Sequence, residues 1–294
     1  MFAGTHTALV TPFTGHGHSV DAHAFCGLID KQFEAGISGV VPVGTTGESP
    51  TLSHEEHVRV IELAVQHTAK RGLVIAGTGS NSTDEAITLT QAAEKAGADA
   101  ALLVAPYYNK PSQEGLFQHY KLIAEASEIP LMLYSIPGRC GIAIEVDTVV
   151  RLAENCPNIR ALKEAGGSVE RVNQLRAALP EDFEILSGDD SLTLPFMSVG
   201  ACGVVSVASN LIPGPMVDLV KAMNEARLGD AQALHRKFYP LFAAFLKLDT
   251  NPVPIKTAMS LAGHCESDLR LPMVPMTEDK VAELKSILAE LGIA

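Results

Sequence analysis

Up to Val207, short β-rich runs alternate with longer segments whose apolar residues recur at helical spacing. This order is typical of parallel βα units. Runs such as 102–104 (Leu-Leu-Val) are apolar at every position, as expected for strands that are covered on both faces. We predict eight strands, over residues 5–10, 39–43, 73–76, 100–104, 131–134, 159–163, 184–186 and 203–207.

The segments between the strands predict crossover helices, and two of them begin with the S-x-x-E spacing of a capping box. The boxes are Ser53 with Glu56 and Ser82 with Glu85, before helices expected over 53–69 and 82–96. After Val207 the strand signals stop. The rest of the chain predicts helices over 213–227, 230–248, 254–261 and 277–291.

Eight strand-helix units within about 225 residues fit a closed (β/α)8 barrel better than a doubly wound sheet, which seldom needs so many units. We therefore expect an α/β protein: a TIM barrel over residues 1–225 with a C-terminal helical region over 226–294. No low-complexity tract or flexible linker separates the two parts, so they should pack as one body.

Composition narrows the classes of protein and partner. Of the 294 residues, 47% are hydrophobic and 19% charged, which supplies the apolar surface for a large core. The net charge is 22 − 34 = −12, and it repels phosphate backbones and anionic lipid, so neither nucleic acid nor a membrane is an expected partner. No apolar run reaches the roughly 18 residues that span a bilayer, and no basic segment precedes an apolar stretch at the N-terminus. Five cysteines without a C-x-x-C pair predict neither a disulfide framework nor a zinc site, so we expect the reducing cytoplasm.

Lys163 closes the sixth predicted strand, at the end of a barrel where reactive groups lie. An apolar barrel mouth removes hydration from the charged amine, so its pKa should fall. A lysine of ordinary pKa is neutral at pH 7 only roughly once in a few thousand molecules, so a Schiff-base nucleophile needs such a depression. Tyr134 ends the neighbouring fifth strand, and its hydroxyl could approach this amine. The alternatives are a lysine that reaches solvent and a tyrosine of the core.

Two further segments offer groups for a ligand. Residues 44–48 (Gly-Thr-Thr-Gly-Glu) follow the second strand, where backbone N–H groups and threonine hydroxyls could face a substrate. They lack the Gly-Lys-Ser/Thr ending of a P-loop. Arg139, after the fifth strand, offers a planar fork that suits a carboxylate. An ordinary turn and a surface arginine are the alternatives.

These pieces occur together and in the order of one known family. Residues 39–49 (GVVPVGTTGES) followed by Glu56 resemble the first signature of the dihydrodipicolinate synthase and N-acetylneuraminate lyase family. Residues 134–137 (YSIP) and 161–165 (ALKEA) resemble its second signature. The resemblance extends from 2–4 (FAG) to 251–256 (NPVPIK) and 271–273 (LPM), which is nearly the whole chain.

Within this family the chain resembles the synthase branch, mainly through Arg139 and through 106–112 (PYYNKPS). The resemblance implies a lyase of lysine biosynthesis by the diaminopimelate route, which condenses pyruvate with L-aspartate 4-semialdehyde and needs no cofactor and no metal. It implies that Lys163 forms an imine with pyruvate and that Arg139 binds the carboxylate of the semialdehyde. The implied proton relay is Thr45, Tyr134 and Tyr108, and the implied pyruvate contacts are Thr46, Gly188 and the backbone at Val205.

The resemblance also implies an assembly and a regulator. It places Tyr108 in the site of a neighbouring subunit, which implies a homo-oligomer, usually a tetramer built as a dimer of dimers. Residues at the positions of a feedback site for lysine suggest allosteric inhibition; they are Ser49, His54, His57, Asn81, Glu85 and Tyr107, with Pro50 as a local departure. His54 and His57 could instead pair on a metal, but no third ligand is near in sequence.

Three departures from the family pattern lie close to this chemistry: Ser135, Cys140 and Gly166. They put substrate preference in doubt without removing a catalytic group. Rival readings are another pyruvate-dependent aldolase of the family, acting on N-acetylneuraminate or a keto-deoxy sugar acid, and a non-catalytic relative that binds pyruvate or an amino acid. A phosphate-binding isomerase is disfavoured because Asp189 and Asp190 would repel phosphate.

Overall fold

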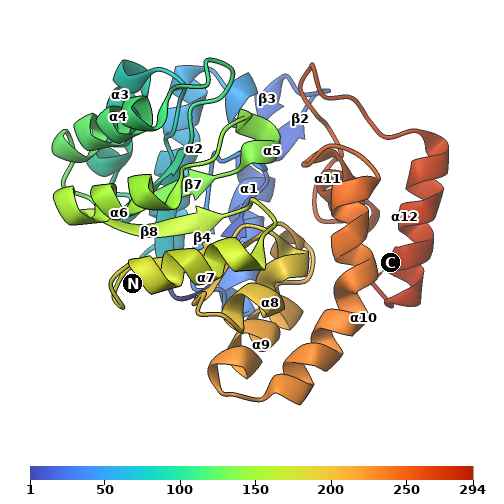
Figure 1. The fold of residues 1–294 in the computed structure, drawn as a ribbon. Helices are drawn as coiled ribbons and strands as arrows, with labels where there is room; N and C mark the ends of the chain where they lie inside the picture. Colours follow the sequence, from blue (N-terminus) through green and yellow to red (C-terminus); the bar gives the residue numbers. More distant parts are fainter. Residues whose placement is uncertain (294) are drawn as a thin grey trace.

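The computed structural model describes residues 1–293, and within them eight parallel strands close a barrel in the order β1-β10-β9-β8-β7-β6-β5-β4 (Figure 1). The predicted (β/α)8 fold and all eight predicted strands are confirmed, with end points that differ by at most two residues. The strands are β1 Gly4–Ala8, β4 Gly39–Val41, β5 Leu73–Gly77, β6 Ala100–Val104, β7 Leu131–Ser135, β8 Ile159–Glu164, β9 Glu184–Ser187 and β10 Gly203–Ser206. A short hairpin of β2 (Phe13–Thr14) and β3 (Ser19–Val20), which the hydrophobic pattern did not reveal, follows β1.

Helices cover the outside of the barrel and form the C-terminal part, where α10 to α12 stand beside it (Figure 1, orange to red). The longer helices are α1 Ala22–Glu34, α2 His54–Thr68, α3 Thr83–Ala96, α4 Gln113–Glu125, α6 Val146–Asn155, α7 Val169–Ala178, α9 Pro213–Asn224, α10 Leu228–Lys247, α11 Val253–Leu261 and α12 Glu278–Glu290. The short ones are α5 Pro137–Cys140, α8 Thr193–Met197 and the 3-10 turns η1 Ser49–Thr51, η2 Asp190–Leu192 and η3 Ala208–Asn210. In residues 1–293 no helix combines the length and the apolar character needed to cross a membrane.

Of the two predicted capping boxes, one is confirmed and one is wrong. Ser53 accepts a hydrogen bond from the Glu56 N–H, and the Glu56 carboxylate accepts one from the Ser53 N–H. Ser82 caps α3 in the same way, but the Glu85 carboxylate does not return the bond. It is held instead by the Ser80 hydroxyl and by His54 Nε2, two partners that lie outside the local S-x-x-E pattern.

The core lies in two layers. Inside the barrel, residues such as Ile75, Met132 and Leu186 fill the interior, and Phe2 is fully buried with them. Outside it, the helices pack on the strands, and α10 shares one apolar cluster with α1 and α9 through Leu241 and Phe242. Because complete burial of such a side chain stabilises a fold by roughly 1.5–3 kcal/mol, this shared cluster fixes the C-terminal helices against the barrel.

Candidate active site

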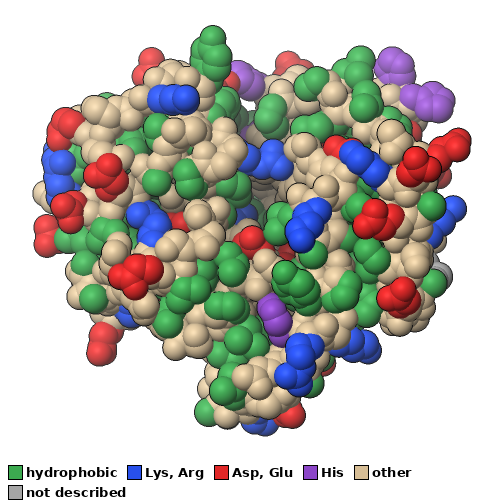
Figure 2. Space-filling model, turned by 45° about the vertical axis from the view of Figure 1, so that its right-hand side comes forward, with side chains coloured by type: hydrophobic (Ala, Val, Ile, Leu, Met, Phe, Trp, Pro, Cys, Tyr) green, Lys and Arg blue, Asp and Glu red, His purple; other side chains and the backbone are tan. Residues whose placement is uncertain are grey.

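A cavity opens at the carboxyl ends of the barrel strands and is walled on its other side by α10 and by Asn251. Figure 2 shows this side of the molecule hollowed between the barrel and the C-terminal helices. The barrel contributes Thr45, Tyr134, Arg139 and Lys163 to its lining. The cavity therefore collects four predicted site residues that are spread over more than a hundred positions in the chain.

Lys163 is buried in the mouth of the barrel, with 5% of its surface exposed. Strands β7 and β8 pair Tyr134 with Lys163, and the amine Nζ lies 4.1 Å from the centroid of the Tyr134 ring. Within the described residues this amine has no hydrogen bond and no ion pair. Burial lowers the pKa of Lys163 to about 7, while the negative charge of Asp190 raises it and the positive charge of Arg139 lowers it further. The amine is thus available as a nucleophile near neutral pH.

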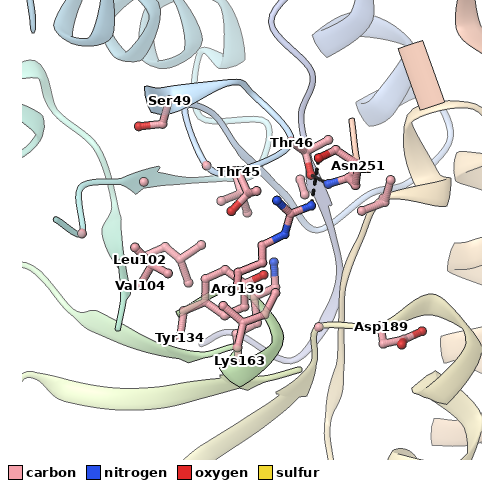
Figure 3. Close-up of a pocket in the computed structure, with 18 of the residues that line it drawn as sticks. Thr45, Thr46, Ser49, Leu102, Val104, Tyr134, Arg139, Lys163, Asp189 and Asn251 are labelled. Atoms are coloured by element: carbon pink, nitrogen blue, oxygen red, sulfur yellow. Dashed lines mark hydrogen bonds between the residues drawn. The ribbon is translucent and has the colours of Figure 1, made fainter. Parts of the chain in front are cut away.

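Tyr134 approaches the Lys163 amine with the face of its ring (Figure 3). Burial raises the pKa of Tyr134, while the positive charge of Arg139 and the nearby Thr45 side chain lower it by less. The phenol therefore keeps its proton at neutral pH. It can pass a proton along a chain of hydroxyl groups, which suits a relay member better than a base.

The loop after β4 brings Thr45 and Thr46 to the cavity. Its backbone folds back on itself, because the Gly47 N–H donates to Gly44 O at 3.1 Å and the Glu48 N–H to Thr45 O at 3.1 Å. The Thr46 hydroxyl accepts a hydrogen bond from Asn251 Nδ2 at 3.0 Å. The sequence had placed this loop at a ligand, but it had not revealed the contact that holds Thr46.

Arg139 lies on α5 with its guanidinium turned toward Asn251, as Figure 3 shows. Its Nη2 donates to the backbone oxygen of Asn251 at 2.9 Å, and the side chain otherwise stays exposed at the cavity rim. Asn251 thus contacts both Thr46 and Arg139 and lines the cavity. It stands in the 251–256 motif of the resemblance, which carried no role for it.

Gly188 follows β9 and borders Lys163. A Cβ at this position would meet the Ala165 Cβ at 2.8 Å and the Lys163 Cε at 3.0 Å, so the space beside the amine requires glycine. Val205, in contrast, is fully buried in the barrel interior, and among the described residues the cavity is lined by Val207 instead.

Asp190 is a buried site residue that sequence reasoning had named only as an obstacle to phosphate. It lines the cavity, and its Oδ2 accepts hydrogen bonds from the Val207 N–H at 3.1 Å and the Ala208 N–H at 2.8 Å. Burial raises its pKa to about 6. The only signal in the sequence was its position directly after a barrel strand.

Tyr108 is not brought to this cavity. Its side chain is 90% exposed and its backbone has φ +73°, whereas the neighbouring Tyr107 lines the cavity. A bulky aromatic side chain held out in a left-handed conformation is unusual. The relay expected from Thr45, Tyr134 and Tyr108 is therefore represented within one chain by its first two members.

The six residues compared with a lysine site lie at the edge of the cavity, which Ser49 and Tyr107 line. His54 Nε2 lies 2.7 Å from Glu85 Oε1, and Ser49 Oγ lies 3.5 Å from His57 Nδ1. Asn81 Nδ2 donates to the Tyr107 backbone oxygen at 3.1 Å. A hydrogen bond from Ser80 lowers the pKa of Glu85, so this carboxylate is ionised at neutral pH.

Metal ligation does not explain these histidines. His57 Nε2 lies 2.8 Å from Gly77 O and faces the protein interior, while His54 turns to Glu85. In the described part of the chain, no group of three or more His, Cys, Asp or Glu side chains is arranged to hold a metal ion.

The three departures from the family pattern make contacts away from the Lys163 amine. The Ser135 hydroxyl accepts from the Ile144 N–H at 3.4 Å, and the Cys140 thiol donates to Ala105 O at 3.1 Å. The Gly166 N–H donates to Glu164 Oε1 at 2.6 Å. These hydrogen bonds support the backbone around α5 and β8, and Cys140 also lines the cavity.

Comparison with known proteins agrees with this geometry. The profile of the Dihydrodipicolinate synthetase family matches residues 1–291. The 4-hydroxy-tetrahydrodipicolinate synthase of Endomicrobium trichonymphae is 48% identical over 293 residues, which cover 100% of this chain and 99% of that protein.

Two solved structures are similar over the full chain. One is a chloride-inhibited dihydrodipicolinate synthase from Acinetobacter baumannii complexed with pyruvate, with a TM-score of 0.97, 44% identity and 100% coverage of both chains. The other is DHDPS from Cyanidioschyzon merolae with lysine bound, with a TM-score of 0.96, 40% identity and coverage of 100% and 99%. The chain therefore belongs to the dihydrodipicolinate synthetase family.

Proposed function

We propose that the chain is a Schiff-base lyase that condenses pyruvate with L-aspartate 4-semialdehyde to 4-hydroxy-tetrahydrodipicolinate, an early step of lysine biosynthesis. The observation that carries the proposal is the buried Lys163 amine, whose pKa is lowered to about 7 and which faces a cavity beside the Tyr134 ring. The family relationship and the pyruvate complex of a 44% identical relative support it.

In the proposed mechanism the neutral Lys163 amine attacks the keto carbon of pyruvate, and loss of water gives an imine. Loss of a methyl proton then gives an enamine, whose carbon attacks the aldehyde of the second substrate. Thr45 and Tyr134 move protons to and from these intermediates, because both keep their hydroxyl protons at neutral pH. Cyclisation and transimination release the product and free the lysine.

Substrate recognition is divided between the two walls of the cavity. We assign the pyruvate carboxylate to the Thr46 side of the loop, with Gly188 and Val207 bordering the space around it. Arg139 holds the carboxylate of the semialdehyde with its guanidinium, whose direction is set by the Asn251 backbone oxygen. A bidentate guanidinium–carboxylate pair orients the aldehyde as well as binding it.

A coupled assay tests this function. Purified protein receives pyruvate and aspartate semialdehyde, with dihydrodipicolinate reductase and NADPH in excess, and condensation appears as loss of nicotinamide absorbance. We expect turnover that is lost in Lys163→Ala, and a borohydride-stable pyruvate adduct on Lys163 by mass spectrometry. Adduct formation with cleavage of N-acetylneuraminate or a keto-deoxy sugar acid, and no synthase turnover, would overturn the substrate assignment. Absence of any adduct would favour a non-catalytic relative.

We further propose a cytoplasmic homo-oligomer, with a tetramer as the expected state. The support is the exposed Tyr108, which supplies a third relay hydroxyl only if it enters the site of a second copy. Analytical ultracentrifugation gives the state, and mixing inactive Tyr108→Phe with inactive Thr45→Val protein tests the exchange. Recovery of activity in the mixture is expected, because some sites then receive an intact set of groups. A fully active monomer would contradict the assignment.

We also propose that lysine inhibits the enzyme at the six-residue cluster of Ser49, His54, His57, Asn81, Glu85 and Tyr107. The ionised Glu85 would pair with an ammonium group, and a relative 40% identical carries bound lysine. A titration of turnover with millimolar lysine tests the proposal, with Glu85→Gln as the variant expected to lose inhibition. Unchanged turnover of the wild type would remove it.

A further inference from the structure

Charged side chains from distant parts of the chain gather around one buried aromatic ring, that of Phe13 in the β2–β3 hairpin. Lys256 Nζ lies 4.2 Å and Arg270 Cζ 4.5 Å from the ring centroid. Each cation also meets a carboxylate: Lys256 meets Glu48, and Arg270 meets Glu56. We call these five residues the Phe13 cluster.

The pair of Glu48 and Lys256 is the most deeply buried part of the Phe13 cluster. Lys256 Nζ lies 2.6 Å from Glu48 Oε1, and the two side chains are 0% and 2% exposed. Lys256 donates a second hydrogen bond to Asp268 O at 2.7 Å, and Glu48 Oε2 accepts from the Arg270 N–H at 3.1 Å. Both charges are thus paired and hydrogen-bonded, which is the condition under which a buried ion pair is tolerated.

The loop that ends at Glu48 is conformationally strained. It is bracketed by two left-handed residues that are not glycine, Val43 with φ +50° and Glu48 with φ +55°. A β-branched residue at positive φ is a marked outlier, and such conformations cost of order 1–3 kcal/mol each. They persist only where surrounding contacts hold them. At the Glu48 end, contacts that hold the loop come from Lys256 in α11 and from the Arg270 N–H in the segment that follows α11.

Helix α11 contacts the same loop a second time. Asn251, two residues before α11 begins, donates to the Thr46 hydroxyl, and Lys256 within α11 binds Glu48. Thr45 and Thr46 therefore lie in a short loop that is held by two residues near the start of α11, Asn251 and Lys256. Since a displacement of about 1 Å in a reacting group can lower a rate by roughly a hundredfold, the restraint has catalytic consequences.

We propose that Glu48 and Lys256 are positioning residues for the condensation: their buried pair fixes the strained loop so that Thr45 and Thr46 meet the pyruvate adduct on Lys163. This inference rests on the proposed function. It gives the C-terminal helices a part in the imine step, although Glu48 and Lys256 touch neither substrate.

The test compares Lys256→Met with the double variant Glu48→Gln/Lys256→Met, which removes both charges and so avoids an unpaired buried carboxylate. Lys280→Met is the control, because Lys280 also joins two C-terminal elements by an ion pair, to Asp249 at 2.7 Å, and this pair does not include Glu48 or Lys256. Two readouts are taken below the melting temperature of every variant. They are the rate of borohydride trapping of pyruvate on Lys163 and the hydrogen exchange of the peptide over 43–52.

We expect trapping to slow by about 10- to 100-fold in both Lys256 variants, with faster exchange over 43–52, and no change in Lys280→Met. The double variant separates positioning from stability, since it folds without a buried unpaired charge and still loses the restraint. The inference would be overturned if the double variant trapped pyruvate at the wild-type rate and its peptide over 43–52 exchanged no faster than that of the wild type. Failure of the wild type to trap pyruvate would instead contradict the proposed function, while the exchange data would still report on the restraint.

Discussion

Two buried lysines each lie over an aromatic ring, and they differ in whether a carboxylate pairs with the amine. Lys163 lies 4.1 Å above the Tyr134 ring and Lys256 lies 4.2 Å above the Phe13 ring. Burial is the largest cause that lowers the pKa of each amine. Lys256 is bound by a carboxylate, whereas no carboxylate of the described chain pairs with Lys163.

The comparison distinguishes a lysine that is held in a structural ion pair from a lysine whose lowered pKa suits it to act as a nucleophile. For Lys256 the charge of Glu48 raises the pKa again and so opposes the effect of burial. For Lys163 the opposing charge is the more remote Asp190, and the pKa stays at about 7. An ordinary lysine is neutral at pH 7 only about once in a few thousand molecules, so burial without a paired carboxylate increases the neutral, nucleophilic fraction of Lys163 by roughly three orders of magnitude.

The largest expected effect is the loss of turnover in Lys163→Met, which tests whether Lys163 and Lys256 have different roles. Turnover should fall by at least about a thousandfold, because among residues 1–293 the cavity lining contains no second lysine to form the imine. The free energy of unfolding should be unchanged or higher, because no partner is left unpaired. Activity in the coupled assay and urea unfolding of the same preparation check both parts. Strong destabilisation would mean that Lys163 is a structural lysine as well.

The reverse pattern is expected from Lys256→Met. Removing one partner leaves the Glu48 carboxylate buried without its counter-charge, so the free energy of unfolding should fall by about 3–5 kcal/mol. Adding Glu48→Gln should recover most of this loss. Urea unfolding measures both, with Lys280→Met as the control at about 1 kcal/mol or less. A Lys256→Met loss no larger than that control would remove the distinction between the two lysines.

The pH dependence of the reaction sharpens the comparison. The neutral Lys163 amine is the reactive form, so kcat/KM for pyruvate should rise with pH and level off above about 7. Below that value it should fall by about tenfold per pH unit, since each unit reduces the neutral fraction tenfold. A profile that keeps rising to pH 9 or above would indicate that burial does not lower this pKa.

A smaller shift is expected from Asp190→Asn. The negative charge of Asp190 raises the pKa of Lys163, so its removal should move the profile to lower pH, by less than burial itself does. The asparagine oxygen can still accept from the Val207 and Ala208 N–H groups, which preserves the turn after β10. The midpoint of kcat/KM for pyruvate, measured beside the wild type, checks the direction. A midpoint at higher pH would contradict it.

The local pattern was sufficient for the elements of the barrel. Short apolar runs between segments of helical periodicity predicted all eight strands of the barrel, because a strand that is buried on both faces must be apolar, whatever it packs against. The same reasoning placed Lys163 and Tyr134 at the ends of adjacent strands, and the register confirms that they pair. It was wrong about the Glu85 half of the second capping box, because Ser80 and His54 compete for that carboxylate.

The amino-acid sequence alone thus determined the barrel, because strand and helix patterns follow from residue type and spacing. Together with the family resemblance, it also singled out Lys163 at the end of a strand. Only the tertiary structure decided which polar groups surround that lysine. Thr46 and Asn251 are 205 residues apart in the chain, and Glu48 and Lys256 are 208 apart, yet each pair is in contact. Hydrogen bonds and ion pairs act over about 3 Å, so their partners are fixed by packing and leave no periodic trace in the sequence.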